Sequence, residues 1–218
     1  MGALSDLRRD ALVRLMKVGS SRAGVARVGD LEVRVAPGVC HPAPFGGVSF
    51  APLFTAALDG LRDGDRVLDL GTGCGIWALL AARAGGRVTA TDLSHVDLTS
   101  IAAAATAHGL AAPRLLHGDL FAPVAGERFD RVLFNPPFHF GEPRDDAERA
   151  YLGGADGEVV KRFLREVPAH LDEGGRAYVI LPAHERAGYQ ADLSAHRVRD
   201  VRSVWLPVLG RVHLLALG

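Results

Sequence analysis

Apolar and polar positions alternate along most of the chain in a way that predicts strands and helices in turn. From residue 66 onward, short apolar runs predict seven strands, near residues 66–70, 87–91, 114–116, 131–134, 176–181, 199–205 and 211–217. Helical spacing of apolar residues predicts helices near residues 76–84, 95–108, 157–171 and 184–195. This alternation is typical of a doubly wound, mostly parallel, seven-stranded α/β sheet with helices on both faces. Because the connection through Pro207 leaves no room for a helix, the last strand is expected to be antiparallel.

The amino-terminal part has a different pattern. Ser5 is suited to cap an amphipathic helix that ends near Gly19. Two branched runs then flank Gly29-Asp30, which predicts a small β-hairpin. The proline- and glycine-containing stretch 37–52 predicts an irregular loop and a candidate lid. We therefore divide the chain into a helix, hairpin and loop extension over residues 1–50 and a core domain over residues 51–218.

Composition narrows the class of protein. The 218 residues carry 25 basic and 25 acidic side chains, so no net charge draws the chain to polyanions. Cys40 and Cys74 are the only cysteines and lack a CxxC or His-rich partner, which supports neither a disulfide framework nor a zinc site, and we predict no metal. The amino end has no signal-peptide pattern, and no stretch is long and apolar enough for a membrane span. We expect a cytoplasmic protein.

A glycine-rich turn follows the first strand of the core domain. Asp69 lies in that strand, which continues through Gly71, Thr72, Gly73 and Gly75 into a helix. Glycines let the backbone approach a ligand, and the free amides of a helix start face an anionic group. Without a ligand, the same glycines would make only a tight connection. The spacing matches neither the GxGxxG of dinucleotide folds nor the Gly-Lys-Ser/Thr ending of a phosphate-binding loop, so phosphate is not the obvious target.

Carboxylates follow the ends of successive strands. Asp92 closes the second strand, where it can accept hydrogen bonds from ribose hydroxyls, although capping the next helix is an alternative role. Asp119 follows the third strand and can accept from the amine of an adenine, although a plain loop position is the simpler interpretation. Together with Asp69, these residues fit a ligand that has an amino group, a ribose and an adenine but no phosphate. S-adenosylmethionine has these groups.

The fourth strand ends in Asn135-Pro136-Pro137-Phe138. The prolines fix the backbone, so the side-chain oxygen of Asn135 and the carbonyl of Pro136 can accept hydrogen bonds from one planar NH2 group. Such bonds turn the nitrogen lone pair toward an electrophilic methyl, and in-line proximity lowers the barrier by ~7–11 kcal/mol in favourable cases. Pro137 and Phe138 are then candidate substrate contacts, Phe138 by stacking. The structural alternative is a proline-stiffened turn.

With these motifs, the chain from about residue 64 to its end resembles class I S-adenosylmethionine-dependent methyltransferases. The resemblance implies that Asp69 and the loop 71–75 hold the methionine part, Asp92 the ribose, and Asp119 with the Leu120 backbone the adenine, with Asn135 also beside the cofactor. It makes residues 51–218 the catalytic domain. Asn-Pro-Pro-Phe/Tyr is found in the members that methylate planar nitrogens. The stretch 150–175 is similar to the HemK-related protein glutamine methyltransferases, and this likeness implies a glutamine side chain of a translation factor as acceptor.

Several features keep other acceptors open. Phe138 stands where the glutamine enzymes usually have tyrosine, and Asn-Pro-Pro-Phe-His followed by Gly141 is also the pattern of guanine-N2 ribosomal RNA enzymes. Residues 42–51 lack the acidic-Ser/Thr pattern of HemK relatives. The alternatives are an RNA guanine or nucleic-acid adenine methyltransferase, a small-molecule enzyme and a non-catalytic cofactor-binding subunit. Neutral net charge tells against nucleic acid unless arginines gather on one face. His139 is interpreted first as a packing residue and second as a substrate contact.

Overall fold

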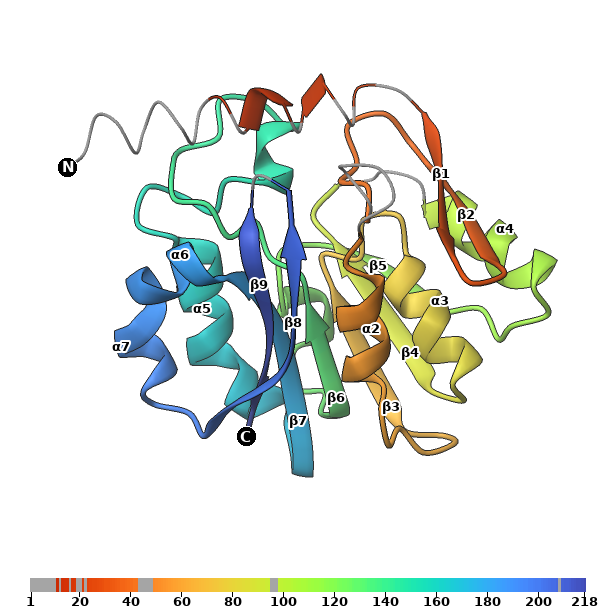
Figure 1. Ribbon diagram of the computed structural model, residues 1–218. Helices are drawn as coiled ribbons and strands as arrows, with labels where there is room; N and C mark the ends of the chain where they lie inside the picture. The colour runs from red at the N-terminus through yellow and green to blue at the C-terminus, as the bar shows by residue number, and fades with distance from the viewer. Residues whose placement is uncertain are drawn as a thin grey trace.

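A seven-stranded mixed sheet forms the centre of the computed structural model, which describes residues 11, 13–15, 17–18, 21, 23–42, 49–94, 98–207 and 209–218 (Figure 1). Its strands lie in the order β5-β4-β3-β6-β7-β9-β8. In chain order they are β3 (Arg66–Leu70), β4 (Arg87–Asp92), β5 (Arg114–His117), β6 (Phe129–Phe134), β7 (Leu171–Pro182), β8 (Val198–Leu206) and β9 (Gly210–Leu217). The strands from β5 to β7 pair in parallel, whereas β9 pairs antiparallel with both β7 and β8. The predicted doubly wound α/β sheet with an antiparallel last strand is confirmed.

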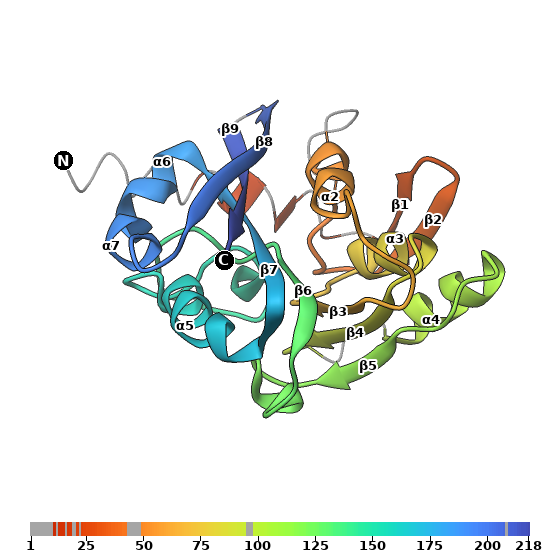
Figure 2. The same cartoon turned by 90° about the horizontal axis from the view of Figure 1, so that it is seen from below.

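Helices cover both faces of the sheet, which is why most residues of its central strands are buried (Figure 2). One face carries α2 (Ala51–Ala57), α3 (Ile76–Arg83) and α4 (Leu98–Ala107), and the other carries α5 (Glu158–Glu166), α6 (Ala183–Arg186) and α7 (Gln190–Leu193). Short 3-10 turns are η1 (Ala122–Val124), η2 (Glu148–Ala150), η3 (Val167–His170) and η4 (Ala187–Tyr189). Among the described helices, none has the length and apolar character needed to cross a membrane.

Three predicted elements differ from the structure. The helix expected over 157–171 ends at Glu166, because Pro168 cannot continue an α-helix and the chain tightens into η3. The helix expected over 184–195 is divided into α6, η4 and α7. Finally, α2 begins at Ala51 inside the stretch expected to be loop; Pro52 occupies its first turn, where proline is favourable.

The amino-terminal part packs onto the core domain. The predicted hairpin is present as β1 (Gly24–Val28) and β2 (Leu31–Val35), and β2 contacts α3 and α4. The described residues between 11 and 18 are helical, while Ser5, residues 43–48 of the predicted loop and the expected helix start at 95–97 lie outside the described residues. The boundary between residues 50 and 51 stays a prediction.

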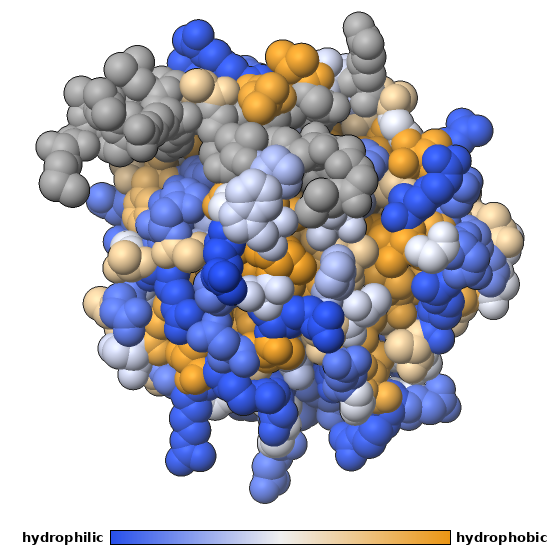
Figure 3. Space-filling model, viewed as in Figure 1, coloured by the Kyte–Doolittle hydropathy of each residue, from blue (hydrophilic) through white to orange (hydrophobic). Residues whose placement is uncertain are grey.

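Basic side chains lie where three of the parallel strands begin. Figure 3 shows hydrophilic side chains projecting at the lower end of the view, where the parallel strands of Figure 1 begin. Arg66, Arg87 and Arg114 are the first residues of β3, β4 and β5, and they line a hollow of about 740 Å³ there. A second cavity, larger than this hollow, lies at the opposite edge, where these strands end.

Candidate functional site

A cavity of about 1310 Å³ lies at the carboxyl ends of β3, β4 and β6. In an open α/β sheet this edge is the usual place for ligands, because the loops after the strands diverge there. The cavity brings together most of the residues that the sequence singles out: Asp69, Gly71, Thr72, Gly73, Asp92, Asp119, Leu120, Asn135, Pro136, Pro137 and Phe138. The sequence-predicted cofactor and acceptor residues therefore share one site.

Gly75 is the exception, since it does not line this cavity. Its φ of +76° lies in the left-handed region, and it caps the start of α3. A Cβ atom at this position would lie 2.5 Å from Cγ1 of Ile101. Gly75 is therefore required by backbone conformation and by the packing of α3 against α4, and its expected cofactor contact stays a prediction.

Asp69 is a buried carboxylate at the base of the glycine loop. Its side chain accepts a hydrogen bond from the Thr72 hydroxyl at 2.7 Å, and the residue is only 2% exposed. Burial raises the pKa of Asp69 to about 7; the Thr72 hydroxyl opposes this shift and the nearby charge of Asp92 adds to it. A cationic amino group at this place would restore the charged form of the carboxylate.

Asp92 connects the glycine loop to the segment after β4. One oxygen accepts from the Gly73 amide at 2.8 Å, and the other accepts from the Ser94 amide at 2.9 Å. The second bond is the local turn expected of a residue that leads into a helix. Because each carboxylate oxygen has two lone pairs, both remain able to accept a hydroxyl from a ligand in the cavity.

Asp119 and Leu120 form the third side of the cofactor half of the cavity. Asp119 accepts a hydrogen bond from the Arg162 guanidinium at 2.7 Å, an ion pair that the sequence did not reveal. Leu120 has φ of +44° and is the one non-glycine residue in the described part of the chain with positive φ. Such strain in a non-glycine residue is retained mainly at functional sites, where the backbone must present its groups in a fixed direction.

Asn135 immediately follows the last residue of β6. It is the only asparagine in the chain, and its Oδ1 atom is buried without a hydrogen-bond partner. A buried carbonyl oxygen without a donor is destabilising by roughly 1–3 kcal/mol, so native proteins rarely contain one unless a ligand supplies the donor. The unpartnered oxygen therefore marks the wall of the cavity where an N–H group fits.

The segment that contains Asn135 is held rigidly from behind. Tyr189 donates its hydroxyl to the Phe138 carbonyl at 2.9 Å, and the backbone of His139 pairs with Tyr151 and Gly153. A Cβ atom on Gly153 would lie 2.3 Å from the Pro137 carbonyl oxygen, so only glycine permits this approach. These contacts fix residues 135–138, here called the acceptor segment, before any ligand binds.

His139 lies behind this segment and does not line the cavity. It is 1% exposed and its Nδ1 lies 2.7 Å from the Glu185 carboxylate. Its position therefore agrees with the packing interpretation and not with a direct substrate contact.

An aromatic wall of the cavity was missed from the sequence. Phe50, Phe54 and Trp77 line it, with the Phe54 and Trp77 rings 4.7 Å apart and the Trp77 indole N–H bonded to the Phe54 carbonyl at 3.1 Å. Residues 37–40 and 42 of the predicted lid also line the cavity. The i, i+4 spacing of the phenylalanines was the available signal, but it describes a core helix equally well.

Comparison with known proteins identifies the family of the chain. The family model described as methyltransferase small domain matches residues 51–202. The chain belongs to this family. The predicted resemblance to class I methyltransferases is thereby confirmed at the level of family and fold.

Relatives and a solved structure show which methyltransferases are similar. Ribosomal protein uL3 glutamine methyltransferase of Bradyrhizobium diazoefficiens is 41% identical over 51% of this chain and 39% of its own. Release factor glutamine methyltransferase of Gloeobacter violaceus is 34% identical over 82% of this chain and 65% of its own. The 16S rRNA N2 G1207 methyltransferase of T. thermophilus, solved with AdoMet and guanosine, has a TM-score of 0.64 and 25% identity, and covers 90% of this chain and 50% of its own. The chain thus spans less than two thirds of each.

Proposed function

We propose that this chain is an S-adenosylmethionine-dependent N-methyltransferase that acts on the side-chain amide of a glutamine in a protein such as a translation factor. The observation that carries the proposal is the buried, unpartnered Oδ1 of Asn135, which shares a cavity with the glycine loop of β3.

The chemistry of the cavity residues fits the cofactor. Asp69 with Gly71 to Gly73 would hold the methionine part, and Asp92 would accept from the ribose hydroxyls. Asp119 with the Leu120 backbone would hold the adenine. When bound, S-adenosylmethionine supplies a methyl group activated by a sulfonium.

The acceptor residues would orient a nitrogen that is otherwise a poor nucleophile. An amide lone pair is delocalised into the carbonyl, so its availability depends on how the two N–H bonds are held. Asn135 Oδ1 and the Pro136 carbonyl would accept those two N–H groups and turn the lone pair into the cavity. The Tyr189 hydroxyl already fixes this segment, so binding of the acceptor needs little further ordering of the protein. The orientation of the nitrogen then lowers the activation barrier of methyl transfer.

Charge favours a protein acceptor over RNA. The cavity lining contains six carboxylates and one guanidinium, those of Asp69, Asp92, Asp119, Glu142, Asp146, Glu158 and Arg149. Three of these carboxylates, Glu142, Asp146 and Glu158, are exposed and lie outside the cofactor half, where they would repel a nucleic-acid backbone. The arginines at the starts of β3, β4 and β5 do gather on one face, but that hollow is at the opposite edge of the sheet from the cavity.

A ribosomal RNA guanine remains the second candidate acceptor. The observation in its favour is the Asn-Pro-Pro-Phe-His sequence, together with the fold likeness to an enzyme solved with guanosine.

The deciding experiment compares two amide variants. Gln190 is the only glutamine of the chain and is exposed on α7, so Gln190→Ala is the matched control for Asn135→Ala. Incubation with methyl-labelled cofactor and cell lysate should give a labelled product that protease destroys and nuclease does not. We expect Asn135→Ala to lower the rate by about 10²-fold or more, with cofactor affinity by calorimetry nearly unchanged, as for removal of one group that contacts the reacting centre. Wild-type turnover in Asn135→Ala would refute the acceptor role, and a nuclease-sensitive product would favour RNA.

A further inference from the structure

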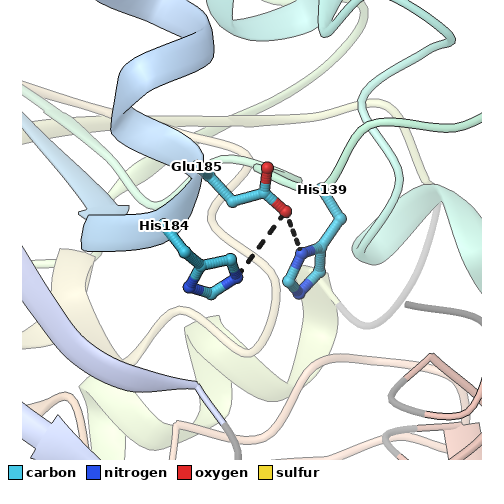
Figure 4. Close-up of side chains that lie close together, drawn as sticks. All are labelled: His139, His184 and Glu185. Carbon is cyan, nitrogen blue, oxygen red and sulfur yellow. Dashed lines mark hydrogen bonds and ion pairs between the residues drawn. The ribbon is translucent and has the colours of Figure 1, made fainter. Parts of the chain in front are cut away.

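Three potential metal ligands meet behind the acceptor segment, outside the cavity. His139 follows Phe138, while His184 and Glu185 lie in α6, directly after β7. Figure 4 shows the two imidazoles and the carboxylate pointing toward one another from these two elements. His139 Nδ1 lies 2.7 Å and His184 Nε2 lies 3.8 Å from Oε1 of Glu185. One ligand atom from each residue lies within 4.8 Å of those from the other two.

We propose that His139, His184 and Glu185 bind a divalent metal ion of the zinc class. Two imidazoles and one carboxylate are a ligand set that zinc uses in proteins, with bonds of about 2.0–2.2 Å. For three atoms with the separations above, the point equidistant from all of them lies roughly 2–2.4 Å from each, so a metal ion fits between them. Tetrahedral angles at that ion would require the 2.7 Å contact between His139 and Glu185 to lengthen as the metal binds. His184 is half exposed, which leaves a fourth position open to water.

The charges of the cluster also favour a cation. The Glu185 side chain is only 14% exposed, and in the described part of the chain its ion-pair partners are the two histidines rather than a lysine or arginine. A carboxylate so removed from water needs a positive partner. A bound metal ion would supply the missing charge.

A hydrogen bond between His139 and Glu185 is the simpler account of the 2.7 Å contact. In that account His184 is held by a hydrogen bond to the Leu209 backbone, and its Nε2 faces the same Glu185 oxygen at a distance beyond hydrogen bonding. The metal would link the residue after Asn-Pro-Pro-Phe to α6, and so would tether the segment that follows β6 to the helix that follows β7. This site is separate from methyl transfer, because none of its three residues lines the cavity.

Zinc binding to the full chain, stripped with a chelator, tests the proposal. Calorimetric titration with zinc chloride should show one site in the wild type, and cobalt chloride should give the visible absorption of a tetrahedral cobalt ion. His184→Ala and Glu185→Gln should each weaken zinc binding at least about tenfold. His139 is left unchanged because it is buried in the fold.

The matched controls are His196→Ala and Glu173→Gln, which alter the same residue types away from the cluster. Both should bind zinc as the wild type does. Absence of zinc binding in the wild type, or equal affinity in His184→Ala and His196→Ala, would overturn the proposal and leave a hydrogen-bonded pair only. Cofactor binding, measured separately, verifies that every variant is folded.

Discussion

Replacing Asp69 by asparagine should make the ligand-free protein more stable at neutral and alkaline pH. Burial raises the pKa of this carboxyl from 3.8 to about 7. The native chain therefore binds more protons than the unfolded chain between about pH 4 and 7, and the free energy of unfolding falls as pH rises through that window. Each pKa unit corresponds to about 1.4 kcal/mol, so the difference between the two pKa values lowers the free energy of unfolding by about 4 kcal/mol above pH 7.

Asparagine keeps an oxygen that can accept from the Thr72 hydroxyl but carries no charge. Since its NH2 group also needs a partner, we expect Asp69→Asn to recover only part of the loss, about 1–3 kcal/mol at pH 8, and nothing at pH 4.

Urea unfolding from pH 4 to pH 8 measures this effect, with Asp59→Asn as the control for an exposed carboxylate. The stability difference between Asp69→Asn and wild type should grow steadily across the window, while the control stays parallel to wild type. The same variant should bind S-adenosylmethionine more weakly, because the charge that faces an amino group is gone. A stability difference that does not change with pH would refute the reasoning about burial.

Two further substitutions test the parts that position the site. Gly75→Ala should lower the free energy of unfolding by about 3 kcal/mol or more, because the added Cβ atom would clash with Ile101. The control Gly109→Ala, at a position with φ of +64° and open space around it, should lower that free energy by only about 1 kcal/mol. Equal losses in chemical unfolding would contradict the packing argument. Glu148→Gln should raise the KM for the acceptor and leave the cofactor Kd unchanged. The reason is that the Glu148 carboxylate binds Arg144 and so fixes the segment 142–150, several residues of which line the cavity. An equal change in both constants would count against this role of Glu148. Arg144 lowers the pKa of Glu148 to about 2, so this hold should persist at pH 5 and be lost only as pH falls from about 4.5 toward 2.

The sheet was predictable from sequence because parallel strands buried on both faces are short runs of mostly apolar residues. The run 66–70, for example, is β3 without change. The irregular helices were not predictable by the same reasoning. Gly188 interrupts the expected helix 184–195, and a Cβ there would lie 2.5 Å from the Phe140 ring. That requirement comes from a contact between distant parts of the chain, which local spacing does not contain.

The polar residues of the site were predictable for a topological reason. Parallel strands end at the same edge, so Asp69, Asp92 and Asn135 had to lie near one another once the strands were assigned. The aromatic wall and the pairing of His139 with Glu185 depend instead on how α2 and α6 pack. The sequence does not distinguish an apolar or histidine side chain in the core from one in a site. The aromatic wall and the His139–Glu185 pair are therefore found only in the structure.

The energetics of the folded chain point to a ligand without reference to any relative. In the described residues, the buried side-chain atoms without a hydrogen-bond partner are Asn135 Oδ1 and His139 Nε2. Asp69 has the strongly raised pKa of a buried carboxylate, and Leu120 holds a left-handed backbone. Three of these four unfavourable features line one cavity, and only His139 lies behind it. Packing alone would favour replacing each of them. An ammonium group near Asp69 and an N–H donor at Asn135 would make the buried carboxylate and the unpartnered oxygen favourable. A site that binds both groups can therefore retain these two residues, although they destabilise the ligand-free fold.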